Sequence, residues 1–482
     1  MTLNEQNGFI KNTGTMILSY TVLFAVLIAG VFSTFYLQHK CLMNIYDAYD
    51  QGYFWTVELK KNLSSLMAGN GFPEWSWSKG PGMEVKAITD PFMVLAALFP
   101  IGHIELGYSV VTILRLYVSG LAFMAFAREV EIARYQAVMG AICYTFSAWI
   151  INVSLVQSQF VNITILFPLL IMSVDRVYKG KSSVPFMILV ALTMINSVYL
   201  AYMAGLSAVL YILLRYFNYC EKFSIKEYVV SVLKFIVYGL IGMAASAVIT
   251  MTTIQSLMGA STGGGSGKAY DTFAGMSFVF NLGNKFVSEG YDFGYGYIGL
   301  PILALMVIAV SYRYFSLRNT QLIMTAIFVI MTPFPFFSSM FNGFGYVTTR
   351  WYFMLIFFLV WTATENFDLD RLAEIKNLII MFIWMAIITV STLGFAYLDI
   401  TENYSRNDIL FVAGSLAAGY LMLVIIATGI KGKTPLKFRQ GAITLITVGA
   451  IACLWTISFQ GSMDTFVKDN EINAQLEAST QR

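Results

Sequence analysis

The sequence predicts an all-α polytopic integral membrane protein with about thirteen transmembrane helices. Apolar residues make up 57% of the chain and charged residues 12%, which is about half the ~25% of a typical soluble protein. The apolar residues form long runs separated by short polar loops. Crossing a bilayer takes ~20 mostly apolar residues, and because lipid offers no backbone partners, runs without barrel-like alternation must be helices.

The remaining composition narrows the class of protein. Phe, Tyr and Trp make up 16% of the chain, which suits aromatic belts at the two lipid–water interfaces. The net charge of +3 is small and spread through loops, so no nucleic-acid partner is expected. The four cysteines, Cys41, Cys143, Cys220 and Cys453, show no metal-binding spacing, and a disulfide framework is not expected.

The predicted spans can be placed along the chain from the apolar runs. They lie near residues 16–36, 105–127, 135–153, 160–175, 185–199, 201–217, 228–256, 296–314, 321–337, 350–366, 377–398, 408–430 and 441–459. The segment 185–217 is either two short helices or one long broken helix. A half-span from Pro91 to Pro100 is expected to dip into the membrane. No small-residue cleavage site closes the first run, so it is predicted to be an uncleaved span.

Basic residues in the short loops predict the orientation. With thirteen spans and the N-terminus inside, six Lys/Arg clusters fall on the cytoplasmic side, as the positive-inside rule requires. The transmembrane domain then covers residues 1–460, and residues 461–482 form a short polar external tail. The two longest loops, 37–90 and 257–295, both face outward. Any chemistry is therefore expected outside the membrane.

The first external loop begins with a pair of acids close to the first span. In a helix from Leu42 to Met67, Asp47, Asp50 and Gln51 share one face. Two such carboxylates at a membrane surface can act as a general base or hold a divalent cation such as Mg²⁺ or Mn²⁺. The alternative is an interfacial amphipathic helix whose acids are simply solvated.

Two other external segments carry candidate binding residues. Trp75 and Trp77, beside a Gly-Pro-Gly turn, suit a loop that offers aromatic faces to a sugar ring, or else an interfacial aromatic anchor. Asn342 and Arg350 lie in an external loop that enters the tenth span. Arg350 can grip a lipid phosphate, or it can snorkel to the interface as an anchor.

Polar residues inside or beside the predicted spans are a third group of candidates. Arg115 lies in mid-span, where an ionisable group costs about 3 kcal/mol and requires a partner or a polar cavity. Candidate groups lining such a cavity, or bonding one helix to another, are Asn196, Gln157, Gln159 and His103.

The order of these motifs resembles that of a known family, the bacterial YfhO-type membrane proteins, which belong to the GT-C class of polyprenyl-phosphate-sugar-dependent glycosyltransferases. The motifs that carry the resemblance are Asp47-Ala-Tyr-Asp-Gln51, Trp75-Ser-Trp77-Ser with Gly80-Pro-Gly82, Asp90-Pro-Phe with Phe99-Pro100, Asn196-Ser-Val-Tyr199-Leu-Ala-Tyr202, Gly299-Leu-Pro301, and Asn342-Gly343 with Arg350-Trp351. The set runs from the first span to the tenth.

The resemblance implies a GT-C-like fold and an outward-facing active site in the bacterial cytoplasmic membrane. Asp47, with Asp50 as the alternative, is implied to be the general base that deprotonates an acceptor hydroxyl. The donor would be a polyprenyl-phosphate-linked sugar, and the acceptor a cell-envelope glycan or teichoic-acid-type polymer. Arg350 and Arg115 would balance the phosphate leaving group with inversion at the anomeric carbon, and Trp75 and Trp77 would stack on sugar.

Two other interpretations stay open at this point. The first is a transporter or flippase of lipid-linked glycans, although internal repeats and further charged mid-span residues are not evident. The second is an inactive scaffold for envelope assembly, since members of the family that the chain resembles are longer than this chain. A long acidic external loop directly after the first helix favours the enzyme.

Overall fold

The structure is a computed structural model and is almost entirely helical. It describes residues 10, 12–70, 89–259, 273–275, 278, 282–287, 298–344, 346–399, 406–432 and 434–469. The chain divides into two compact units. The first consists of Met1–Thr34, Gly120–Asn152 and Tyr270–Gly461, and the second of Phe35–Ser119, Val153–Ala269 and Ser462–Arg482.

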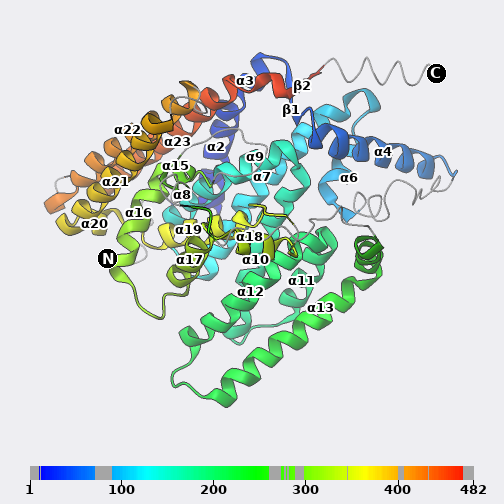
Figure 1. Cartoon of the computed structure of the whole chain (residues 1–482), viewed down its shortest axis with the longest axis horizontal. Coiled ribbons are helices and arrows are strands. Elements are labelled where there is room, and N and C mark those ends of the chain that lie inside the picture. The colour runs from blue at the N-terminus through cyan, green and yellow to red at the C-terminus, as the bar shows by residue number, and fades with distance from the viewer. Residues whose placement is uncertain are drawn as a thin grey trace. The chain divides into compact units, whose positions relative to one another are not determined.

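The first unit is a bundle of helices (Figure 1). Its helices are α2 (Thr13–Val31), α8 (Arg134–Thr145), α15 (Leu282–Val287), α16 (Ile302–Ser311), α17 (Thr320–Met331), α18 (Pro335–Phe341), α19 (Tyr352–Glu365), α20 (Leu369–Leu372), α21 (Ile375–Asp399), α22 (Arg406–Ala427) and α23 (Leu436–Gln460). Two further helices, α7 (Ile104–Glu129) and α9 (Ala148–Val156), cross the boundary between the units.

Helix α19 forms the core of the first unit. Its side chains are buried on all sides from Tyr352 to Thr364, as expected of a helix enclosed by other helices, here α8, α16 and α17. Helices α2 and α23 approach closely where Gly30 faces Ala452, since a Cβ at Gly30 would lie 2.7 Å from the Ala452 Cβ. By contrast, α21, α22 and α23 expose large apolar side chains such as Val390, Val424 and Leu445, which suits contact with lipid.

The second unit contains the segments that surround the candidate site. Its helices are α4 (Phe54–Met67), α6 (Pro91–Ala97), α10 (Asn162–Tyr178), α11 (Val184–Asn196), α12 (Val198–Tyr219) and α13 (Ile225–Gly259). It also contains a π-helix, η1 (Ala48–Tyr53), and two 3-10 turns, η3 (Ile101–His103) and η4 (Ser158–Val161). A short helix, α3 (Ser33–Leu37), leads into this unit from α2.

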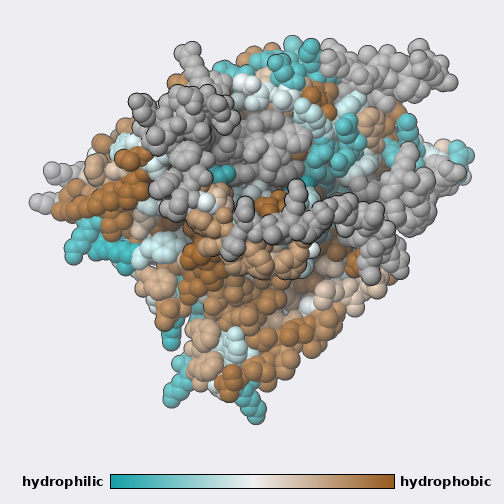
Figure 2. Space-filling view, in the orientation of Figure 1, coloured by the Kyte–Doolittle hydropathy of each residue, from teal (hydrophilic) through white to brown (hydrophobic). Residues whose placement is uncertain are grey.

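Helix α13 presents a long apolar face outward. It packs on α11, where Gly242 approaches Val190 and the backbone of Met187 too closely to leave room for a Cβ. Its other face exposes Leu233, Leu240 and Val248 among many apolar residues. The surface over α12 and α13 is accordingly mostly hydrophobic (Figure 2). An apolar surface of this extent is expected to face the lipid of a bilayer.

The segment after the first helix corrects part of the helical prediction for Leu42 to Met67. Residues Lys40–Asn44 form strand β1, which pairs antiparallel with β2 (Phe466–Lys468), and helical structure begins only at Asp47. The prediction was wrong for Leu42 to Asn44 because the partner strand lies more than four hundred residues away in sequence, where local periodicity cannot reveal it.

The described helices agree with the predicted spans in position. Eight helices are long and apolar enough to cross a membrane, or up to ten if each of two bent pairs counts as one span, among the residues that the structure describes. Three shorter apolar helices, Val184–Asn196, Ile302–Tyr314 and Tyr352–Glu365, lie at the other predicted positions. The segment 185–217 is two helices, α11 and α12, separated at Ser197. The count of thirteen and the orientation stay predictions.

Candidate active site

Asp47 is held in place by two side-chain amides. Gln51 Nε2 donates to its Oδ1 at 3.1 Å, and Gln157 Nε2 donates to its Oδ2 at 2.9 Å. The Asp47 side chain is half-buried, whereas that of Asp50 is exposed. The structure therefore distinguishes the two acids that the sequence offered as alternatives. Both donors are neutral, so they orient the carboxylate without cancelling its charge.

The backbone around Asp47 is irregular. Asp47 directly precedes the π-helix η1, and Asn44 Oδ1 accepts the N–H of Ala48 at 2.9 Å to secure its first turn. π-Helical turns are rare and often occur at functional sites. Gly52, within η1, allows the Tyr108 side chain to approach, because a Cβ at Gly52 would lie 2.7 Å from the Tyr108 hydroxyl. The carbonyl of Gly52 accepts from Thr56 Oγ1 at 2.8 Å.

Gln157 comes from a break between helices. Helix α9 ends at Val156, at a bend of 47° from α8, and the 3-10 turn η4 connects Gln157 to α10. Residues 157–162 are all buried. At membrane depth, irregular backbone is tolerated where it is enclosed by protein or lines a polar cavity. The break therefore places the Gln157 amide against Asp47, while the side chains of Ser158 and Asn162 contact Arg115.

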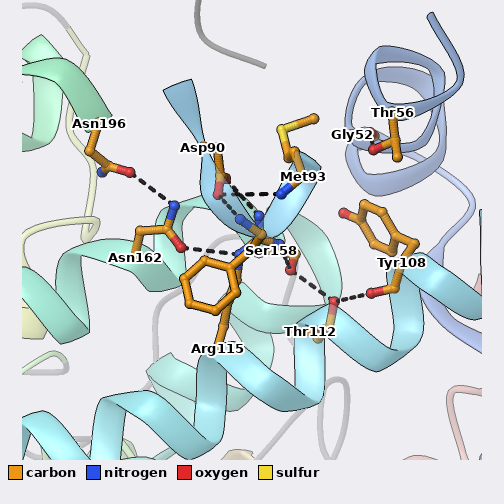
Figure 3. A network of polar contacts seen from close by, with 11 residues as sticks. Gly52, Thr56, Asp90, Met93, Tyr108, Thr112, Arg115, Ser158, Asn162 and Asn196 are labelled. Atoms are coloured by element: carbon orange, nitrogen blue, oxygen red, sulfur yellow. Dashed lines mark hydrogen bonds and ion pairs between the residues drawn. The ribbon is translucent and has the colours of Figure 1, made fainter. Parts of the chain in front are cut away.

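Arg115 has the partners that its mid-span position required. Its Nη2 forms an ion pair with Asp90 Oδ2 at 2.6 Å, and its Nε donates to Asn162 Oδ1 at 3.1 Å (Figure 3). Its Nη1 donates to Ser158 Oγ at 2.5 Å. Only 1% of the Arg115 side chain and 6% of the Asp90 side chain are exposed. A charge this deeply buried is tolerated only when it is paired and hydrogen-bonded.

The polar network extends from Arg115 in two directions. Toward α11, Asn162 Nδ2 donates to Asn196 Oδ1 at 3.0 Å. Through Ser158 it returns to α7 one turn earlier, where the hydroxyls of Ser158 and Thr112 lie 2.8 Å apart and Thr112 Oγ1 also donates to the Tyr108 carbonyl (Figure 3). Because Gln157 and Ser158 are consecutive, the Asp47 group and the Arg115 group are joined through the backbone at the start of η4, within the second unit.

Other predicted site residues lie elsewhere in the structure. Trp75 and Trp77 fall outside the described residues. Asn342, at the C-terminal end of α18, donates through Nδ2 to the Tyr346 carbonyl at 2.8 Å, and Arg350 precedes α19 in the same unit. His103 is exposed at the end of η3. For these residues the substrate-binding roles stay predictions.

Within the described chain, no three His, Cys, Asp or Glu side chains group as metal ligands. Asp47 already accepts two amide hydrogen bonds, and Asp50 is exposed. The divalent cation therefore stays a prediction that rests on these two acids alone.

Several members of the network were not among the predicted site residues. Asp90 forms the ion pair with Arg115. Ser158 and Asn162 accept the other two hydrogen bonds from its guanidinium. One signal in the sequence pointed to Asp90: it is an acid at the start of the short apolar run from Pro91, in a chain with one evident mid-span Arg. Ser158 and Asn162 carried no such signal, since both are ordinary polar residues beside or within an apolar span.

Two titratable groups beside the π-helix stay protonated to unusually high pH. Burial raises the pKa of the Tyr53 hydroxyl, and the nearby Glu105 carboxylate raises it further. Burial likewise raises the pKa of the Cys41 thiol, with a second contribution from Asp469, whose carboxylate accepts the Sγ–H at 3.0 Å. Both residues belong to the apolar cluster under η1, so they support the loop as neutral packing groups.

The fold and the network define a multi-pass helical membrane protein with a buried polar site beside its first loop. The family described as bacterial membrane protein YfhO matches residues 19–482, and this chain belongs to that family.

Two solved structures of ArnT from Cupriavidus metallidurans are also similar to this chain. The apo structure has 13% sequence identity and a TM-score of 0.48, covering 93% of this chain and 78% of its own. The structure bound to undecaprenyl phosphate has 14% identity and a TM-score of 0.47, covering 91% and 76%. The search of curated proteins gave no match.

Proposed function

We propose that this protein is a membrane glycosyltransferase that transfers a sugar from a polyprenyl-phosphate donor to a cell-envelope polymer on the outer face. The observation that carries the proposal is the Asp47 carboxylate, which two neutral amides hold in the loop after the first helix of a YfhO family member. The resemblance of the sequence to GT-C enzymes implies an essential acid at this position.

Asp47 would act as the general base. It accepts the proton of an acceptor hydroxyl as that oxygen attacks the anomeric carbon, and the bond from this carbon to the phosphate oxygen breaks. A single displacement inverts the anomeric centre and releases the polyprenyl phosphate. Gln51 and Gln157 are neutral donors, so they orient the carboxylate without placing a competing cation beside it.

The other predicted residues would bind the substrates. Arg350 would balance the charge of the departing phosphate, and Trp75 and Trp77 would stack on sugar rings. The acceptor class, a teichoic-acid-type or other surface glycan, rests on the family resemblance alone. A divalent cation, if used, would be held at Asp47 and Asp50.

The proposal is tested by following the sugar as it leaves its lipid. Purified protein in liposomes would be given polyprenyl-phosphate sugars labelled in the sugar, with an envelope extract as acceptor. Loss of label from the lipid and its gain in polymer support the proposal. Intact donor across a panel of sugars and acceptors would contradict it.

A flippase of lipid-linked glycans is the second candidate. The helix breaks at Gln157 and Ser197 favour it, since broken helices lined with polar groups are typical of transporters. Protein-dependent movement of the donor between leaflets, without any transfer, would support this alternative.

A further inference from the structure

Arg115 is enclosed on every side that the structure describes. Each of its three guanidinium nitrogens donates to a protein oxygen, and the Phe92 ring lies 5.2 Å from its central carbon. Its side chain is 1% exposed, and its charge is matched by Asp90. A residue that binds the phosphate of the lipid-linked sugar needs N–H groups that the phosphate can reach and a positive charge that no other group already balances. The Arg115 side chain is closed to solvent and its charge is already paired with Asp90, so its role lies in what it holds together.

Asp90 joins two elements through its two carboxylate oxygens. Oδ1 accepts from the backbone N–H groups of Phe92 and Met93, at 2.9 and 3.4 Å, and so caps helix α6. Oδ2 accepts from Arg115 on α7 at 2.6 Å. The pair therefore fixes the point at which the first external loop returns to the helices.

Ser158 links this pair to Asp47. It accepts from Arg115 Nη1, and it directly follows Gln157, whose amide donates to Asp47. The Arg115 guanidinium also accounts for the position of Asn162, at the start of α10. A displacement of the guanidinium would consequently move η4 and, with it, the amide that orients the carboxylate.

We infer that Asp90 and Arg115 are positioning residues that set the geometry of Asp47. This inference rests on the proposed function, in which Asp47 is the base. The Asp90–Arg115 pair acts on the rate of transfer through Ser158 and Gln157, and it does not contact the donor phosphate.

The chain contains a matched control for the experiment. In the same unit, Arg215 on α12 pairs with Asp175 on α10 at 2.7 Å, and the Asp175 carboxylate also accepts from Tyr211 and Tyr219. This second buried pair joins two helices without contacting the residues that hold Asp47. Arg215→Gln thus removes a buried ion pair, as Arg115→Gln does, but this pair makes no contact with the residues that hold Asp47.

The test compares Arg115→Gln, Asp90→Asn, their double variant and Arg215→Gln as full-length proteins in liposomes. Steady-state transfer gives kcat and the donor KM, and hydrogen–deuterium exchange reports on residues 45–58. Because a 1 Å misplacement can cost ~10²-fold in rate, we expect kcat to fall by about that factor in Arg115→Gln with the donor KM within about threefold.

Exchange is expected to quicken in residues 45–58 of Arg115→Gln and to stay at the wild-type rate in Arg215→Gln. The double variant, which leaves no unpaired charge, should recover part of the lost kcat. A raised donor KM at unchanged kcat would overturn the inference and make Arg115 a phosphate ligand. Equal exchange in wild type and Arg115→Gln would also overturn it. If wild type transfers no sugar, the proposed function fails, and the exchange comparison still decides whether the pair positions the Asp47 loop.

Discussion

The side-chain amide of Gln157 donates to Asp47 Oδ2 at 2.9 Å and thereby joins a helix break to the first external loop, 110 residues away in sequence. The orientation of the amide follows from chemistry, since a carboxylate can only accept and must face the Nε2 end. Its Oε1 is buried and forms no hydrogen bond among the described residues. Gln157 is thus the residue through which the rest of the network reaches Asp47.

The first prediction concerns this hydrogen bond. Gln157→Leu keeps a similar volume but removes the donor, so the Asp47 carboxylate loses one of its two orienting bonds. We expect kcat for sugar transfer to fall by about 10-fold to 100-fold, because small errors in the position of a base are costly. Gln159→Leu, at a second buried glutamine two residues away, is the control and should keep most of the activity. Equal losses in both variants would contradict the prediction.

The second prediction concerns the space beside the π-helix. Gly52→Ala places a Cβ 2.7 Å from the Tyr108 hydroxyl, and overpacking of this kind costs about 1–3 kcal/mol of stability. The thermal unfolding temperature in detergent should fall. Gly205→Ala, in helix α12 with open space around the new methyl group, should instead stabilise by about 0.5–1 kcal/mol. An unchanged unfolding temperature in Gly52→Ala would show that η1 lies farther from Tyr108 than it does in this structure.

The third prediction concerns the pH dependence of the Cys41 thiol. Burial and Asp469 raise its pKa, so the folded protein keeps the neutral thiol at pH values where an unfolded cysteine ionises. The contribution of Cys41 to stability is therefore present below the ordinary thiol pKa and is lost as pH rises above it. Alkylation by iodoacetamide should spare Cys41 at pH 9 in folded protein and modify Cys220, which is partly exposed. Modification of both thiols at similar rates would refute this.

The fourth prediction concerns orientation in the membrane. In a variant that lacks Cys220 and the exposed Cys453, a cysteine introduced at Arg318 or at Lys468 would report on opposite sides, and both positions are exposed. An impermeant maleimide should label Lys468→Cys in intact spheroplasts and Arg318→Cys only after permeabilisation, as the positive-inside rule predicts. Labelling of both positions from the same side would contradict the predicted span count.

Much of the fold could be predicted from the sequence because lipid restricts the options. Apolar runs must become helices, so their positions follow directly from hydropathy. Because a charge in mid-span is costly, the sequence also predicted that Arg115 has a partner, and Asp90 is that partner. The break at Ser197 was expected as one of two possibilities.

What could not be predicted depends on contacts between distant segments. Strand β1 pairs with β2 across the whole chain, and its Cys-Leu-Met run fits a helix equally well by local pattern. The distinction between Asp47 and Asp50 also depends on Gln157, which the sequence indicated only as a residue that lines a polar cavity or bonds one helix to another. Periodicity places both acids on one face but does not show which of them meets a donor.

The most direct test of the account is sugar transfer by wild type, Asp47→Asn and Asp50→Asn, each checked for folding by its unfolding temperature. Removing a general base costs about 10²-fold to 10⁴-fold in rate. We predict that Asp47→Asn loses transfer by that factor, while Asp50→Asn, with its exposed side chain, keeps activity close to that of wild type. Transfer by Asp47→Asn at the wild-type rate would contradict the assignment of Asp47 as the base.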